Sequence, residues 1–205
     1  MTDPLRAILA GALDLDPILP VSERLLSVWF GPKAERDETA TQSWWFTSSD
    51  VVDATLIALF SQDVGNALSG RLDALLETPP GALSLVLLLD PLPRHLWRGH
   101  SRAFAGDGRA RETAIEILRR GHDRGLRPVE RLFCYLPFVH AEDPLDQERG
   151  LALVEGLGHA PWYAYAVRHA EAIDRFGRFP QRNAALGRPS TPEEEAYLRD
   201  PANQF

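Results

Sequence analysis

Residues 78–90 read TPPGALSLVLLLD, and this stretch decides what kind of protein the chain can form. Within Ala82–Leu89 only Ser84 is polar, so a helix here would be apolar on nearly every side and would have to be buried all round. The run is rich in leucine rather than in β-branched residues, which favours a helix over a buried strand. Thr78 followed by Pro79 is a typical helix start, because the hydroxyl caps free amide hydrogens and proline lacks one. The sequence therefore predicts a buried helix that begins at Pro79.

Helices are also predicted on both sides of this stretch, because apolar residues recur three and four positions apart and no segment shows the alternation of a strand. The pairs Asp143-Pro144 and Thr191-Pro192 repeat the start signal, and Glu194 completes a capping box with Thr191. The expected helices include two early stripes, Leu25–Trp29 and Leu56–Leu68, and the segments Ser101–Arg120, Glu130–Ala141, Pro144–Leu157, Pro161–Phe176 and Pro192–Leu198. Short loops between amphipathic helices imply antiparallel helical hairpins, so we expect about seven to nine helices. We expect one all-α domain over residues 1–205.

Composition and charge exclude several classes of protein. The chain has 205 residues with a net charge of −7, which disfavours binding to nucleic acid or to an anionic membrane surface. The one cysteine, Cys134, excludes an intramolecular disulfide and a cysteine-rich zinc site. No apolar run approaches the roughly 20 residues of a membrane-spanning helix, and residues 1–16 make a poor signal peptide. We therefore expect a cytoplasmic protein; a homo-oligomer is compatible with the sequence but cannot be deduced from it.

Three long stretches resemble a known family. They are LLLDPLPRHLWRG at 87–99, RLFCYLPFVHAEDPLDQER at 131–149 and RHAEAIDRFGRFPQRNAALGRPSTPEEEAYL at 168–198. In this order they are similar to the bacterial "domain of unknown function 924" family, over about residues 22–198. The resemblance implies a helical array similar to tetratricopeptide-repeat proteins and implies no activity. The chain departs from the family pattern at Pro91-Leu92, at His95 and at Gln181, so family roles at those positions do not transfer.

Two histidines fall on helix faces that should be buried, where an ionisable group is costly unless it is paired. His169 shares the apolar side of the helix Pro161–Phe176 with Tyr165 and Ile173. It is either a core imidazole that donates to a carbonyl group or a functional residue. His140 follows Pro137, which should kink its helix. That kink either fits the helix around its neighbours or opens a pocket beside His140 and Glu142.

Two aspartates have ambiguous roles. Asp90 either ends the buried helix, where its charge needs a cationic partner such as Arg94 or Arg98, or caps a second short helix that begins at Pro91. Asp107 precedes Arg111 by four residues, and this spacing predicts an ion pair along one helix.

The segment RFGRFPQRN at 175–183 concentrates basic side chains around Gly177, which is suited to end a helix. Arg178, Arg182 and Asn183 are suited to bind a flat anion such as a carboxylate or phosphate, because a guanidinium can donate two parallel hydrogen bonds. The alternative is that these residues form a structural network that ties the C-terminal loop to the rest of the fold.

The function favoured by these residues is binding of a small anionic ligand or a peptide carboxylate in a pocket lined by arginine and histidine. The candidate ligand-binding residues are Asp90, Arg94, Arg98, His140, His169, Arg178, Arg182 and Asn183. The first alternative is a hydrolase-like enzyme in which His140, Glu142 and His169 carry acid–base or metal-assisted chemistry. The second is a purely structural or interaction protein. The sequence specifies no metal site, no identifiable cofactor and no established catalytic motif.

Overall fold

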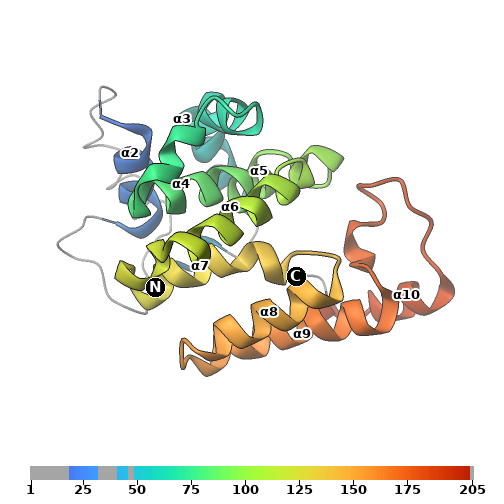
Figure 1. The fold of residues 1–205 in the computed structure, drawn as a ribbon. Helices are drawn as coiled ribbons and strands as arrows, with labels where there is room; N and C mark the ends of the chain where they lie inside the picture. Colours follow the sequence, from blue (N-terminus) through green and yellow to red (C-terminus); the bar gives the residue numbers. More distant parts are fainter. Residues whose placement is uncertain (1–18, 32–40, 46–48, 204–205) are drawn as a thin grey trace.

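The computed structural model describes residues 19–31, 41–45 and 49–203, and within these ranges the secondary structure consists of helices and the loops between them, without a strand (Figure 1). Nine α-helices, α2 to α10, lie in these ranges, so the predicted all-α class is confirmed. None of the helices in them is both long and apolar enough to cross a bilayer.

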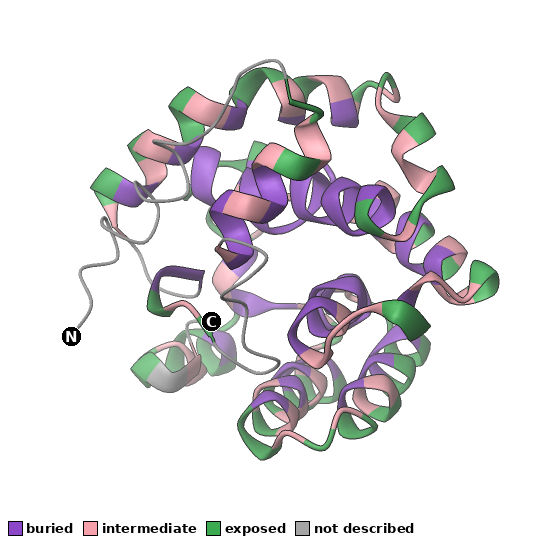
Figure 2. Cartoon of the chain, turned by 90° about the vertical axis from the view of Figure 1, so that its left-hand side faces the viewer, coloured by how far each residue is buried: buried purple, intermediate pink, exposed green. Residues whose placement is uncertain are grey.

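Helix α4 (Pro79–Leu89) lies at the centre of the N-terminal half. Every residue from Gly81 to Leu89 is buried, as predicted for a helix that is apolar on all sides. The buried positions gather on the inner helices and the exposed positions on the outer ones (Figure 2). The α-helices that surround α4 are α2 (Val21–Phe30), α3 (Asp50–Leu68), α5 (Pro91–Leu96), α6 (Asp107–Arg120) and α7 (Pro128–Val139).

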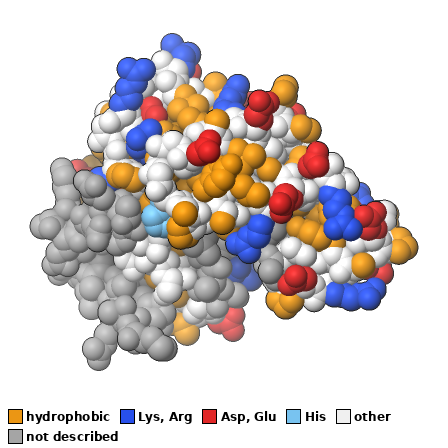
Figure 3. Space-filling model, turned by 90° about the horizontal axis from the view of Figure 1, so that it is seen from below, with side chains coloured by type: hydrophobic (Ala, Val, Ile, Leu, Met, Phe, Trp, Pro, Cys, Tyr) orange, Lys and Arg blue, Asp and Glu red, His pale blue; other side chains and the backbone are white. Residues whose placement is uncertain are grey.

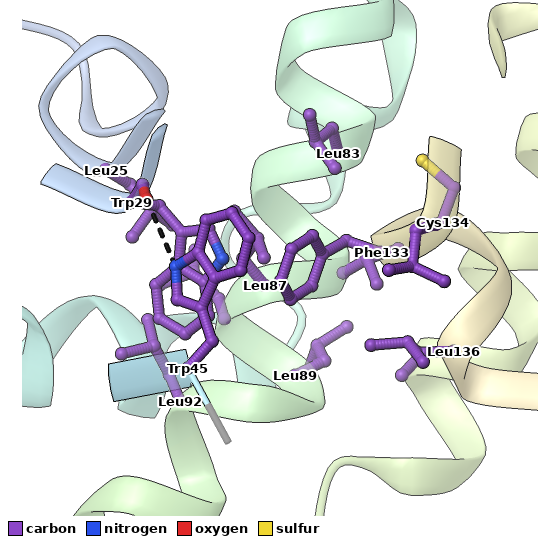
Figure 4. Close-up of a cluster of buried hydrophobic side chains, with 14 of the residues drawn as sticks. Leu25, Trp29, Trp45, Leu83, Leu87, Leu89, Leu92, Phe133, Cys134 and Leu136 are labelled. Carbon is purple, nitrogen blue, oxygen red and sulfur yellow. Dashed lines mark hydrogen bonds between the residues drawn. The ribbon is translucent and has the colours of Figure 1, made fainter. Parts of the chain in front are cut away.

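The 3-10 helix η2 (Ser43–Trp45) packs against this core through its tryptophan side chains (Figure 4). The indole N–H of Trp45 donates to the backbone oxygen of Trp29 at 3.1 Å. The ring of Trp45 meets that of Phe133 edge to face, with centroids 4.9 Å apart, which is a favoured arrangement for two aromatic rings. Residues from α2, η2 and α7 therefore share one core with α4.

The C-terminal half is built on α7, α8 (Pro144–Glu155) and α9 (Ala160–Phe176), in which each helix runs antiparallel to the one before it (Figure 1). The predicted caps are confirmed: Asp143 accepts from the amides of Leu145 and Asp146, and Thr191 and Glu194 form the capping box of α10 (Pro192–Tyr197). This succession of hairpins is compatible with the tetratricopeptide-repeat-like array that the resemblance implies. The other 3-10 helices are η3 (Asp73–Glu77), η4 (Ser101–Phe104), η5 (His122–Gly125), η6 (Pro180–Arg182) and η7 (Pro201–Asn203).

The prediction of one helix over Ser101–Arg120 is wrong, because the chain forms η4 and α6 with a break at Ala105 and Gly106. The break lies against the C-terminal end of α4. A Cβ atom on Gly106 would stand 2.0 Å from the carbonyl oxygen of Leu89, so only glycine permits this close approach. Packing against α4 therefore sets the true start of α6 at Asp107.

This contact gives a stability prediction. We expect Gly106→Ala to lower the free energy of unfolding by about 3 kcal/mol, because the added methyl group overlaps backbone atoms that belong to the central helix. Gly108→Ala is the matched control, since a Cβ atom there meets nothing within 4 Å. It should leave stability unchanged or raise it by up to about 1 kcal/mol. Urea unfolding followed by circular dichroism measures both; equal stabilities would contradict the close approach of α4 and α6.

Candidate functional site

A cavity of about 830 Å³ lies where α5, α7, α9 and η6 meet. Part of its wall is apolar and includes Trp45, Phe104, Leu132, Phe133, Leu136 and Trp162. Another part of the wall consists of arginine and histidine side chains. They are Arg94, Arg98, Arg168, Arg182, His95, His140, His159 and His169. The volume is within the range of pockets that hold small organic molecules.

Three residues of this wall, Arg94, His140 and Arg182, form with Asp90 and Asp107 behind them what we call the buried ion cluster. Asp107, the first residue of α6, accepts hydrogen bonds from Arg94 at 3.0 and 3.1 Å and from Arg182 at 3.0 Å. Arg182 also donates to the backbone oxygen of His140 at 2.9 Å. Side chains up to 75 positions apart in the chain are thus joined by charge-assisted hydrogen bonds, which are stronger than those between neutral groups.

Asp90 and His140 form the innermost pair of the cluster. Asp90 is 0% exposed and is the C-cap residue of α4. It also stands at the N-cap position of α5, but its side chain makes no capping hydrogen bond there, so the structure supports the first role considered from the sequence, a charge at the end of the buried helix. Nδ1 of His140 lies 2.8 and 2.9 Å from the two carboxylate oxygens of Asp90. The backbone oxygen of Asp90 accepts from Arg94 at 2.7 Å. Arg94 also lies 3.6 Å from a carboxylate oxygen of Asp90, so it is the cationic partner expected for that charge.

The environment sets the charge of this pair. Burial would raise the pKa of Asp90, but the positive charge of Arg94 and the contact with His140 lower it to about 2. Burial lowers the pKa of His140, because the charged imidazolium loses its hydration. The carboxylate of Asp90 opposes this effect and the charges of Arg94 and Arg182 add to it, so the pKa stays below its ordinary value. Near neutral pH the pair is therefore a carboxylate and a neutral imidazole that donates from Nδ1.

His169 lies beside this pair on α9. Its ring centroid is 5.7 Å from that of His140, and its Nδ1 is 2.9 Å from the backbone oxygen of Tyr165. Burial, followed by the neighbouring His140, holds the pKa of His169 well below its ordinary value. His169 therefore donates to a carbonyl group, the first of the two roles considered from the sequence, and it also lines the cavity.

A second aspartate–histidine pair lies on the same wall and was missed by the sequence analysis. Nδ1 of His95 is 2.8 Å from Asp53, which also accepts two hydrogen bonds from Arg98, at 3.1 and 3.2 Å. Burial opposes the ionisation of Asp53, but these hydrogen bonds lower its pKa below the ordinary value. The helical spacing could have indicated Asp53, because it lies three and seven positions before Leu56 and Phe60 and so shares the buried face of α3 with them.

Three of the predicted site residues, Glu142, Arg178 and Asn183, are absent from the described cavity lining and belong to a separate C-terminal network. Glu142 accepts from Arg188 at 2.6 and 2.9 Å and from the amide of Phe179 at 2.8 Å. The remaining contacts are Arg178 to Glu194 at 2.6 and 2.8 Å, and Asn183 to Ser190 at 3.0 Å and to Glu194 at 3.3 Å. The structure thus brings Arg94, Arg98, His140, His169 and Arg182 together at the cavity, with Asp90 directly behind them.

The predicted ion pair between Asp107 and Arg111 is wrong. Asp107 turns toward Arg94 and Arg182, whereas Arg111 donates to Asp146 on α8. Both carboxylates, those of Asp107 and Asp146, are largely shielded from water, and an ion pair is stronger in such an environment than in water. The pairs between different helices therefore form in place of the local pair. Among the described residues, no group of three or more His, Cys, Asp or Glu side chains is placed to hold a metal ion.

Comparison with known proteins identifies a solved structure with a similar fold and the family to which the chain belongs. A solved structure, "Structure of Protein of Unknown Function ATU0120 from Agrobacterium tumefaciens", matches with a TM-score of 0.75 and 39% identity, over 80% of this chain and 93% of that chain. No curated protein matches the chain. Residues 25–202 match the family described as "Bacterial protein of unknown function (DUF924)". The chain therefore belongs to the DUF924 family of bacterial proteins.

Proposed function

We propose that the protein binds a small organic anion with an apolar body in this cavity. The observation that carries the proposal is the composition of the wall. Among the described residues that line it there are four arginines and no aspartate or glutamate, in a chain with 29 acidic and 22 basic residues. On the face that Figure 3 shows, acidic and basic side chains are interspersed. The carboxylate partners of three of these arginines lie behind the lining, so the groups that face the cavity are hydrogen-bond donors, which favour a ligand with anionic acceptor atoms.

The arginines of the ion cluster would enter the interaction already oriented. Arg94 and Arg182 are held by Asp107, and the guanidinium of Arg182 also stacks on Phe104 and Phe179, 4.8 and 4.5 Å from the ring centroids. Side chains held in this way lose little conformational freedom when a ligand binds, which favours affinity. The aromatic part of the wall offers a surface for the apolar body of the ligand.

An enzyme is the second candidate, and the contact between Asp90 and His140 is the observation that favours it. A carboxylate that holds Nδ1 of a neutral histidine leaves Nε2 able to accept a proton, as a general base requires. NMR spectra of an organic acid incubated with the protein for several hours distinguish an enzyme from a protein that only binds the acid. Chemical conversion that is lost in His140→Gln would favour the enzyme, and an unchanged spectrum would favour binding alone.

Ligand binding is tested first at the rim of the cavity. Arg98 has a side chain that is 44% exposed, so its loss should spare the core. We expect Arg98→Gln to weaken the binding of 3-phenylpropionate by about tenfold, because one charge-assisted contact is lost. Arg119→Gln, the same change at an exposed α6 residue outside the described cavity lining, should leave affinity unchanged.

Isothermal titration calorimetry measures both variants against the wild type. The ligand screen that precedes it uses thermal shifts with carboxylates and phosphates that carry apolar groups, since a bound ligand stabilises the fold. The proposal is wrong if no member of this panel raises the melting temperature. It is also wrong if Arg98→Gln and Arg119→Gln affect affinity equally.

The neutral histidines predict a pH dependence of stability. Burial keeps the pKa values of His140 and His169 below the ordinary value of 6.5, so the unfolded chain takes up protons first as the pH falls. We expect the free energy of unfolding to decrease from about pH 6.5 downward, by up to about 1.4 kcal/mol per pH unit for each histidine. Above that pH both groups are neutral in both states, and their contribution is constant.

The variant His169→Gln isolates one of these contributions. It should reduce the slope of stability against pH between about pH 6.5 and 5, because one proton fewer is taken up on unfolding. The difference between variant and wild type at pH 8 measures the structural cost of the change and is subtracted. Identical slopes in urea unfolding would show that His169 takes up its proton equally in the folded and the unfolded chain, which would contradict the prediction.

A further inference from the structure

The hydrogen bonds of His140 determine that its second ring nitrogen, Nε2, is a hydrogen-bond acceptor. Nδ1 faces both oxygens of Asp90, so it carries the ring proton and donates. Burial and the charges of Arg94 and Arg182 lower the pKa of the ring, which supports the neutral form. Nε2 then carries a lone pair and can only accept a hydrogen bond.

This acceptor opens into the cavity. The side chain of His140 is 10% exposed and lines the cavity, while its Nδ1 side is covered by the fully buried Asp90. Within the described part of the chain, Nε2 of His140 receives no hydrogen bond. The nearby guanidinium groups donate elsewhere, Arg94 to Asp90 and Asp107, and Arg182 to Asp107 and the backbone of His140. A ligand that fills this space has to supply the donor or leave a polar atom without a partner.

The surrounding charge decides what kind of donor is suitable. Asp90 favours positive charge at the His140 ring, but it lies on the Nδ1 side and is already paired, whereas Arg94 and Arg182 disfavour such a charge. A ligand ammonium group at Nε2 would therefore meet the repulsion of the two arginines. A hydroxyl group donates without a charge. The acid group of the ligand would meet the arginines of the wall, and the apolar body the aromatic side chains.

We propose that the cavity binds a hydroxy acid, a carboxylate whose hydroxyl group donates a hydrogen bond to Nε2 of His140. This inference rests on the proposed function, because it requires that an organic anion occupies the cavity. It goes further in naming the chemical class of the ligand and the residue that selects the hydroxyl group.

Matched acids test the inference. The probes are 3-phenylpropionate, its 2-hydroxy and 3-hydroxy derivatives, and phenylalanine, titrated calorimetrically into the full chain at pH 8. We expect one hydroxy acid to bind about tenfold more tightly than 3-phenylpropionate, because the deoxy acid leaves the acceptor unpaired. Phenylalanine, with an ammonium in place of the hydroxyl, should bind no more tightly than 3-phenylpropionate.

Variants assign the preference to a residue. In His140→Phe the hydroxy acid and 3-phenylpropionate should bind with about equal affinity, because an aromatic ring remains and the hydrogen-bond acceptor is lost. The preference should persist in His95→Gln, which changes the other histidine held by an aspartate on this wall. If His140→Phe does not fold, ¹⁵N NMR of the wild type takes its place: Nε2 of His140 should shift on addition of the hydroxy acid and not on addition of 3-phenylpropionate.

The outcomes separate the two proposals. If none of the probes binds, the proposed function and the inference both fail for organic acids. If the hydroxy acids and 3-phenylpropionate bind equally, the inference fails and the proposed function stands. Tighter binding of phenylalanine, or loss of the preference in His95→Gln alone, would also overturn the assignment of a hydroxyl group to His140.

Discussion

The fold depends on the pairing of Asp90, a carboxylate that water cannot reach. A charge at 0% exposure is stable only if cations and hydrogen-bond donors surround it, and here His140 and Arg94 meet that demand. Arg94 in turn pairs with Asp107, and Asp107 with Arg182. The requirement to neutralise one charge thus fixes the junction of α4 and α5, the start of α6, the end of α7 and η6 relative to one another.

The same cluster forms the back wall of the cavity. Because the carboxylates lie behind the arginines, the cavity is lined by donors and imidazoles and, in the described lining, by no acidic side chain. Buried ion pairs contribute little net stability compared with apolar packing, but they favour one geometry, since a misplaced charge would be left unpaired. The geometry held in this way is a set of oriented guanidinium and imidazole groups beside an aromatic surface. These groups are the basis of the proposed function.

The C-terminal network explains why similar residues have different roles. Arg178, Arg188 and Arg182 lie within 11 positions of one another, yet only Arg182 lines the cavity in the part that the structure describes. Arg178 is paired with Glu194 and Arg188 with Glu142, and these contacts hold the loop that follows α9 against the end of α7 and against α10. The loop positions Arg182, so this network contributes to the cavity indirectly.

The sequence by itself determined the helical class, the buried position of α4 and the caps at Thr78, Asp143 and Thr191, because these depend on spacing and on residues within one turn of each other. It also singled out His140 and His169, because an ionisable group on an apolar stripe is visible in the spacing alone. Tertiary structure decided the rest. The break at Gly106 depends on the carbonyl group of Leu89, Arg111 pairs with Asp146 instead of Asp107, and Asp53 meets His95 across 42 positions. Such contacts join helices far apart in the chain, and their partners are set by how the helices pack, which local spacing does not encode.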